Sequence, residues 1–174
     1  IDRKLLELGT KNSDEVRHWL TQNLIAVGRA SEARQEFETL RREAPQMLVE
    51  FPLTEAKLLH LEGRADEALA RAEKRLREKP DDLDAAVLAG RIHLAQSRLE
   101  AAVGTLEKVV RADPTYEEAH YLLGQAYARR GDAEKAKHHL AMHRRVLDLK
   151  VQLYRLERKA SQTRDRQVRL ALAA

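Results

Sequence analysis

The stretch that decides the fold lies at residues 118–136 and reads Glu-Ala-His-Tyr-Leu-Leu-Gly-Gln-Ala-Tyr-Ala-Arg-Arg-Gly-Asp-Ala-Glu-Lys-Ala. Gly124 follows two leucines within a helical pattern, and its missing side chain would let a neighbouring helix approach closely. Gly131 separates this segment from a second helical one, where glycine favours the end of a helix and a turn. The stretch therefore predicts two helices that pack against each other across a glycine turn.

Alanines repeat along the whole chain with a nearly constant spacing. Steps of 35, 34 and 34 residues separate Ala33, Ala68, Ala102 and Ala136. Prolines and glycines follow the same period, at Pro45, Pro80 and Pro114, at Gly28, Gly63 and Gly131, and at Gly90 and Gly124. A period of this length is typical of stacked supersecondary units, each of which buries its apolar face against the next.

The unit at residues 83–116 shows why these positions recur. Asp81 follows a proline and is expected to cap the first helix with its carboxylate. The second helix is expected to end before Pro114, which lacks an amide hydrogen and disfavours helix in the residue before it. Thr115, three residues before Glu118, has the form of a capping box for the next helix.

These residues resemble the pattern of the tetratricopeptide repeat (TPR) family, which has leucine then glycine, an aromatic residue three positions on, a turn glycine and an alanine after it. The resemblance covers residues 13–148. It implies an all-α fold, an α-α solenoid of helix-turn-helix repeats that forms a right-handed superhelix with a concave binding face. We expect repeats at residues 12–48 (degenerate), 49–82, 83–116 and 117–148. The chain departs from the pattern at Thr21 and Ala56, which replace first-helix glycines, and at Ser97, which replaces a turn glycine.

The residues outside the repeats suggest a fragment of a longer array. Residues 1–11 fit the end of a preceding second helix, with Gly9 as its C-cap. Residues 149–174 contain no glycine or proline. We expect the last helix to continue past Asp148, to break near residues 161–163 and to be followed by the start of a further helix. The apolar ends of such an array would be available for self-association.

The composition, with 43% hydrophobic, 34% charged and only 4% aromatic residues, is typical of a helical solenoid. No apolar run approaches the roughly 18 residues that a membrane helix requires, so no membrane insertion is expected. Residues 150–174 hold seven Lys and Arg against two Asp and Glu, a net charge of +5. Because the whole chain has a net charge of +4, residues 1–149 have a net charge of −1. The repeats therefore lack the basic stripe that nucleic acid requires. The arginine-rich composition favours a bacterial source.

No pattern of catalytic residues occurs, so the sequence predicts no enzyme, no catalytic site, no cofactor and no metal site. The chain has no cysteine and no glycine-rich loop of the kind that cradles phosphates. His139 and His143 lie four residues apart on one helical face, but no third ligand accompanies them. His93 and His120 are expected to be buried or half-buried structural residues, and Trp19 is expected to fill the core.

The resemblance implies that first-helix residues of the four repeats line the concave face. One row is mostly apolar or aromatic and consists of His18, Leu53, Val87 and Tyr121. The parallel row has long polar side chains, at Gln22, Lys57, Arg91 and Gln125, with Arg129 one turn beyond. Such a groove suits a peptide or partner helix that alternates apolar anchors with acidic groups, which Lys57 and Arg91 would meet.

We therefore predict a non-catalytic protein-protein interaction scaffold that is one module of a larger protein. Three alternatives stay open at this point. The chain could be an accessory repeat segment of a multidomain enzyme, an oligomerisation element that pairs through its ends or its long C-terminal helix, or a nucleic-acid-binding protein through its basic tail. Separately, the groove positions could be only solvent-exposed positions of a spacer repeat. A nucleic-acid role for the basic tail ranks last.

Overall fold

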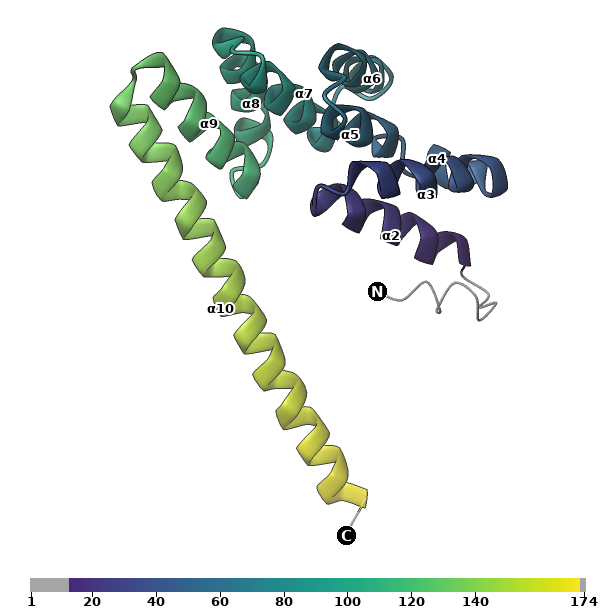
Figure 1. Cartoon of the computed structure of the whole chain (residues 1–174). Coiled ribbons are helices and arrows are strands. Elements are labelled where there is room, and N and C mark those ends of the chain that lie inside the picture. Colours follow the sequence, from purple (N-terminus) through teal and green to yellow (C-terminus); the bar gives the residue numbers. More distant parts are fainter. Residues whose placement is uncertain (1–12, 173–174) are drawn as a thin grey trace. The chain divides into compact units, whose positions relative to one another are not determined.

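The computed structural model describes the backbone of residues 13–172 and the side chains of residues 13–162. Every regular element in this part is an α-helix (Figure 1). The prediction of an all-α fold is confirmed, whereas the helix end predicted at residues 1–11 lies outside the described residues. The chain divides into two compact units, unit 1 at residues 1–98 and unit 2 at residues 99–174.

Unit 1 consists of short helices that pack in pairs. In chain order they are α2 (Ser13–Ala26), α3 (Ala30–Glu43), α4 (Pro45–Glu50), α5 (Thr54–Leu61), α6 (Ala65–Glu78) and α7 (Leu83–Ala95). Helix α2 packs against α3, and α6 packs against both α5 and α7. The interior is built from small and branched apolar residues, and Ala33, Ala56, Ala68, Ala72 and Ala85 are fully buried.

Unit 2 contains α8 (Leu99–Ala112), α9 (Glu117–Arg130) and α10 (Ala133–Leu172), with α9 packed against both other helices. A Cβ atom at Gly124 would lie 2.7 Å from the side chain of Leu140, so glycine permits the close contact of α9 with α10. Tyr127 is 1% exposed, stacks on His139 and donates a hydrogen bond to Glu107. Burial and the Glu107 carboxylate raise the pKa of Tyr127 to about 12.

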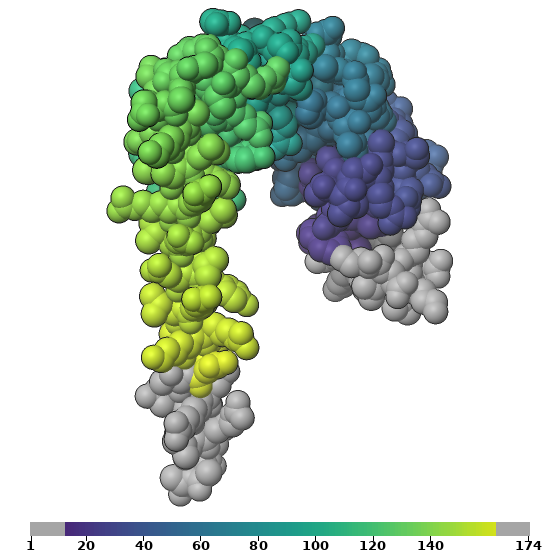
Figure 2. Space-filling model, turned by 60° about the vertical axis from the view of Figure 1, so that its left-hand side comes forward, coloured from purple at the N-terminus to yellow at the C-terminus, as the bar shows by residue number. Residues whose placement is uncertain are grey.

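Helix α10 runs unbroken from Ala133 to Leu172, so the break predicted near residues 161–163 and the further helix after it are not present. The reason is local, because this stretch has no glycine or proline to end a helix. In Figure 2 its yellow-green section extends away from α8 and α9. This section exposes large apolar side chains, at Leu149, Val151, Leu153, Tyr154 and Leu156.

Within the described residues, no helix is both long and apolar enough to cross a membrane.

The chain around Pro52 departs from the repeat pattern. The pattern places a first helix from about Val49 with Pro52 in its first turn. In the structure α4 ends at Glu50, a turn occupies residues 51–53, and the next helix begins only at Thr54. Proline disfavours helical geometry in the residue before it, and Phe51 accordingly has φ −118° and ψ 66°. The interruption leaves the Phe51 side chain 38% exposed at the surface of unit 1.

Two of the predicted helix caps lie one residue further along the chain. Asp82, not Asp81, caps α7, and its carboxylate accepts a hydrogen bond from the backbone N–H of Ala85 at 3.0 Å. Tyr116, not Thr115, is the N-cap residue of α9. The Thr115 N–H and hydroxyl groups instead donate to the Asp113 carboxylate, at 2.8 and 2.7 Å.

Turns that follow α2, α5, α7 and α9 share one backbone conformation. Gly28, Gly63 and Gly131 have φ between 78° and 86°, and Ser97 occupies the fourth position with φ 61°. Each turn has the same two backbone hydrogen bonds. The N–H of the glycine or of Ser97 donates to the carbonyl three residues earlier at 3.1 Å, and the N–H of the following residue donates to the carbonyl five residues before it at 2.9 Å. These bonds form the Schellman motif, which usually requires glycine.

We expect Ser97→Gly to increase the free energy of unfolding by roughly 0.5–1 kcal/mol, because a left-handed backbone is strained for any residue with a Cβ atom. Denaturant unfolding followed by circular dichroism would measure the change. Ser97→Ala is the matched control, since it removes the hydroxyl group but keeps the Cβ atom. A Ser97→Gly variant no more stable than Ser97→Ala would contradict the strain at this turn.

Candidate functional site

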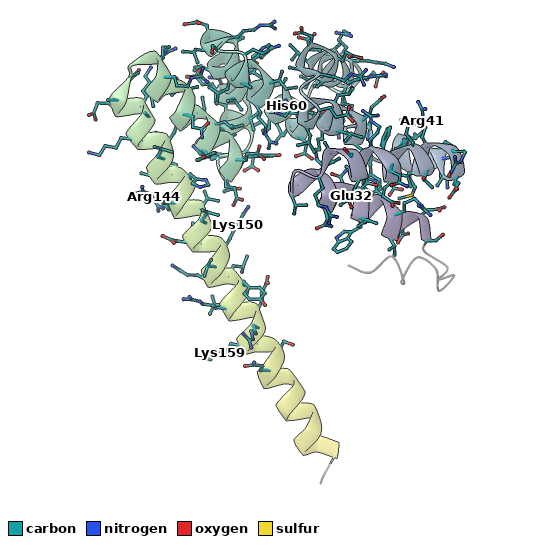
Figure 3. The ribbon with its side chains drawn as sticks, viewed as in Figure 1. Glu32, Arg41, His60, Arg144, Lys150 and Lys159 are labelled. Carbon is teal, nitrogen blue, oxygen red and sulfur yellow. The ribbon has the colours of Figure 1, made fainter. Side chains whose placement is uncertain are left out.

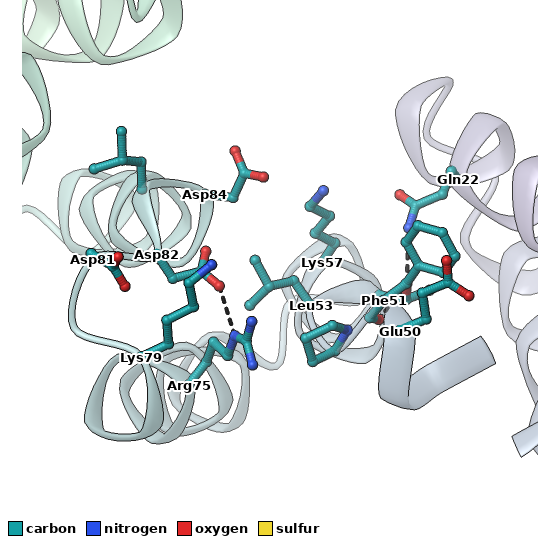
Figure 4. A pocket seen from close by; sticks show the side chains of 13 residues that line it. Gln22, Glu50, Phe51, Leu53, Lys57, Arg75, Lys79, Asp81, Asp82 and Asp84 are labelled. Atoms are coloured by element: carbon teal, nitrogen blue, oxygen red, sulfur yellow. Dashed lines mark hydrogen bonds and ion pairs between the residues drawn. The ribbon is translucent and has the colours of Figure 1, made fainter. Parts of the chain in front are cut away.

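A hollow of about 360 Å³ lies on unit 1, where α2, α5, α6, α7 and the turn before α5 face it (Figure 4). Its lining combines a few apolar side chains with many charged ones. The lining residues are Gln22, Glu50, Phe51, Pro52, Leu53, Thr54, Lys57, Arg75, Lys79, Asp81, Asp82, Leu83 and Asp84. We call this the charged hollow.

Hydrogen bonds fix one wall of the charged hollow. The side-chain amide of Gln22, on α2, donates to the Thr54 hydroxyl at 2.9 Å, and this hydroxyl donates to the Phe51 carbonyl at 3.0 Å. The chain of bonds joins α2 to the turn that Pro52 creates. Leu53, which precedes Thr54 in this turn, is only 8% exposed and forms an apolar floor of the charged hollow.

Charges in the charged hollow differ in how they are compensated. Arg75 donates to the Asp82 carboxylate at 2.6 Å. Burial raises the pKa of Asp82, but the hydrogen bonds from Arg75 and the Ala85 N–H outweigh it, so this pKa lies below its usual range. Lys57 has no ion pair among the described residues, and Figure 4 shows it extending into the same space as Asp84. Lys79 also lines the hollow without an ion pair in this described part of the chain, although its charge helps to lower the pKa of Asp82. Lys57 and Lys79 are therefore the two lining cations available to a ligand.

A second hollow of about 480 Å³ adjoins the first on unit 1. It is lined by Glu15, His18, Trp19, Gln22, Met47, Glu50 and Phe51, and it shares three of these residues with the charged hollow. The rings of His18 and Phe51 stack with centroids 3.9 Å apart and planes 20° from parallel. Burial lowers the pKa of His18, so this ring is neutral near pH 7. We call this the aromatic hollow.

Four of the nine predicted groove residues line these two hollows, namely His18, Gln22, Leu53 and Lys57. Two others, Val87 and Arg91, also lie in unit 1. Val87 is 3% exposed and belongs to the core, and Arg91 is exposed but lines neither hollow. The binding role of these residues stays a prediction.

The remaining three predicted groove residues, Tyr121, Gln125 and Arg129, lie on α9 of unit 2. Tyr121 is 43% exposed, and its ring packs against His143 on α10 with centroids 5.3 Å apart. Arg129 is exposed and Gln125 is half-buried.

Sequence reasoning missed the role of the aromatic residues in unit 1. Trp19, expected to fill the core, is 47% exposed and lines the aromatic hollow instead. Phe51 and Glu50 were not among the predicted site residues. The available signal was Pro52, because an interrupted helix exposes side chains that a continuous helix would have packed.

The two histidines considered as a metal pair have other partners. His139 Nδ1 lies 3.0 Å from Nδ1 of His120, whose Nε2 donates to the Pro114 carbonyl. His143 Nδ1 instead bonds to the Glu117 carbonyl at 3.0 Å. Across the described residues, no group of three side chains is placed to hold a metal ion. His120, 4% exposed, is the buried structural histidine that the sequence predicts.

Helix α10 of unit 2 carries basic side chains that Figure 3 shows projecting from the helix, including Arg144, Lys150 and Lys159. Lys150 forms an ion pair with Glu117 on α9 at 2.8 Å, close to where the two helices separate. This part of α10 lines neither hollow of unit 1.

Comparison with known proteins gives three kinds of similarity. A model of the TPR repeat matches residues 90–131. The TPR repeat-containing thioredoxin TTL4 of Arabidopsis thaliana is 36% identical over 90 residues, which cover 49% of this chain and 12% of that protein. The chain thus spans about an eighth of the length of this relative.

Solved structures extend the similarity over most of the fold. A thermophilic TPR protein of Thermus thermophilus superposes with a TM-score of 0.68 and 25% identity, covering 78% of this chain and 75% of that one. A double mutant of MamA from RS-1 gives a TM-score of 0.56 at 24% identity, and another MamA structure gives 0.57 at 17%. They cover 76% and 80% of this chain, and 74% and 75% of their own. At these identities the MamA structures show likeness of fold only.

We expect the free energy of unfolding to fall as the pH is lowered below about 6.5. Burial, with the nearby His120 and His138, lowers the pKa of His139 to about 4, and burial also lowers the pKa of His18, His60 and His93. The unfolded chain therefore binds more protons than the folded chain below the ordinary histidine pKa of 6.5. The stabilisation is fully present above that pH and is lost as the pH falls toward 4.

Urea unfolding at intervals from about pH 7.5 down to about pH 5, where carboxylates are still mostly ionised, would measure this dependence. His139→Gln should reduce the slope of stability against pH, whereas His138→Gln, which removes only one of the charges that lower the pKa of His139, should reduce it less. Equal slopes for both variants and the parent would show that His139 is not the group responsible.

Proposed function

This chain is a tetratricopeptide-repeat protein, and from that premise we propose that it is a non-catalytic scaffold whose unit 1 binds an extended peptide segment of a partner protein. Repeat scaffolds of this family commonly serve protein interaction. The observation that supports the proposal is the charged hollow, because it gathers Gln22, Leu53 and Lys57 from two of the predicted repeats around one concave surface.

The lining suggests what the peptide presents. Leu53 and Phe51 offer apolar surface that would accept an apolar anchor. Lys57, without an ion pair among the described residues, would meet an acidic group of the peptide. Arg91 lines neither hollow, so Lys57 is the stronger candidate for this contact.

A catalytic role has less support from the same residues. A general acid at neutral pH needs a raised carboxyl pKa, whereas the displaced carboxyl pKa values among the described residues are all lowered, at Glu62, Glu67, Asp82, Glu107 and Asp113. The Arabidopsis relative is named a thioredoxin, but this chain has no cysteine and cannot supply thiol chemistry itself. An accessory role beside an enzyme domain is compatible with the scaffold proposed here.

A selection of random twelve-residue peptides displayed on phage would test the proposal on the whole 174-residue chain. We expect selected peptides to share an acidic residue near an apolar one, and Lys57→Glu to weaken their binding about tenfold through charge repulsion. Lys108→Glu makes the same charge change at an exposed site outside both hollows and should have no effect. Peptides that bind both variants equally would exclude the charged hollow as the site.

The long helix supports a second candidate function, which is self-association. Leu149, Leu153 and Leu156 are spaced as in a heptad repeat and are 53%, 56% and 64% exposed. Val146 continues the stripe toward α9 and is 6% exposed. An apolar stripe of this kind is stabilised when a second helix covers it.

If α10 pairs with a second copy, light scattering should give a mass that rises with concentration from 19.9 kDa toward twice that value. Leu153→Glu should return the chain to a monomer. Val151→Glu is the matched control, because Val151 is similarly exposed but lies on the opposite side of the helix. A constant monomer mass would remove this candidate.

A further inference from the structure

We propose that the aromatic hollow binds the guanidinium group of an arginine side chain, held between Trp19, Phe51 and Glu50. This inference rests on the proposed function, because the arginine would belong to the same peptide that occupies the charged hollow. It adds a basic residue to a ligand for which the sequence predicts only apolar and acidic groups.

The charge of the lining is the first argument. The charged residues that line the aromatic hollow are both glutamates, Glu15 and Glu50, and no lysine or arginine is among its lining residues. Glu50 is exposed and has no ion pair within the described residues. A cation entering this hollow would therefore gain attraction from both carboxylates and meet no like charge among the lining residues, although the charge of Lys57 reaches His18.

The aromatic rings supply the second argument. Trp19 is 47% exposed and Phe51 is 38% exposed, and both line the hollow. Phe51 is held in place by stacking on His18 at 3.9 Å. Cations bind over aromatic faces, most strongly over tryptophan, and a planar guanidinium group also stacks on such faces.

A buried polar atom without a partner gives the third argument, which is independent of the charges. His18 is 7% exposed and lines the hollow, yet within the described part of the chain its Nδ1 atom has no hydrogen-bond partner. Such a group is costly to leave unsatisfied. The neutral ring can accept a hydrogen bond from an N–H donor, and a guanidinium group has five.

The size and position of the aromatic hollow agree with an arginine in a longer peptide. Its volume of about 480 Å³ accommodates a long side chain, and it shares Gln22, Glu50 and Phe51 with the charged hollow. One extended peptide could therefore place its arginine beside Glu50 and its acidic residue beside Lys57. The two contacts would fix the direction in which the peptide binds.

Trp19 is the single tryptophan of the chain, so its indole N–H gives one unambiguous signal in a nitrogen-proton correlation spectrum. The probes are acetyl-Gly-Leu-Arg-Leu-Gly-amide and the same peptide with citrulline, a neutral analogue of nearly the same shape. We expect the arginine peptide to shift the Trp19 signal saturably and to bind about tenfold more tightly than the citrulline peptide.

Variants then test which groups act. Glu50→Gln should bring the affinity for the arginine peptide closer to that for the citrulline peptide, because it removes one of the two carboxylates of the hollow. Glu78→Gln removes an exposed carboxylate outside both hollows and should change nothing. Equal affinity for the two peptides, or no saturable shift with either, would overturn the arginine site. The peptides selected through Lys57 test the charged hollow separately, so failure of one site can be told from failure of the other.

Discussion

Close packing of paired helices through alanine is the constraint on which the rest of this structure depends. Ala33, Ala68 and Ala102 are completely buried, and Ala136 is 5% exposed. A larger side chain at such a position would separate the two helices and disturb their remaining contacts. Gly124 shows the same constraint on α9, where even one added carbon would meet Leu140 at 2.7 Å.

The candidate site lies where the chain around Pro52 interrupts this regularity. Pro52 ends the helical conformation at Phe51 and delays the start of α5 to Thr54. The turn that results is held by the Thr54 hydroxyl and by Gln22. It places Phe51 against His18 and lets two hollows form side by side, so a local backbone effect of one proline generates a surface able to recognise side chains.

Electrostatics distinguish the two hollows although they adjoin. The charged hollow contains carboxylates and cations together, with Asp82 neutralised by Arg75 and Lys57 left without an ion pair among the described residues. The aromatic hollow has only carboxylates as charged lining groups and a neutral imidazole beneath them. A ligand that alternates charge along its length would therefore match the surface better than a uniformly acidic one.

The sequence by itself determined the helix pairs and the turns between them, because these depend on residues close together in the chain. Gly28, Gly63 and Gly131 predicted three turns, and the structure shows that Ser97, which replaces a fourth turn glycine, has the same conformation. It also determined that α10 continues past residue 148, since that stretch has no glycine or proline to end a helix. The break expected near residues 161–163 was wrong, because no such residue is present there either.

Only the tertiary structure decided which side chains share a hollow. A repeat pattern assigns equivalent positions equivalent surroundings, so it placed Trp19 in the core, whereas Trp19 is 47% exposed and lines the aromatic hollow. The position of Trp19 differs from the prediction because the interrupted helix brings residues that are distant in sequence, such as Trp19 and Glu50, to the same hollow. Burial, and with it the lowered pKa of His18, likewise depends on neighbours that local sequence does not specify.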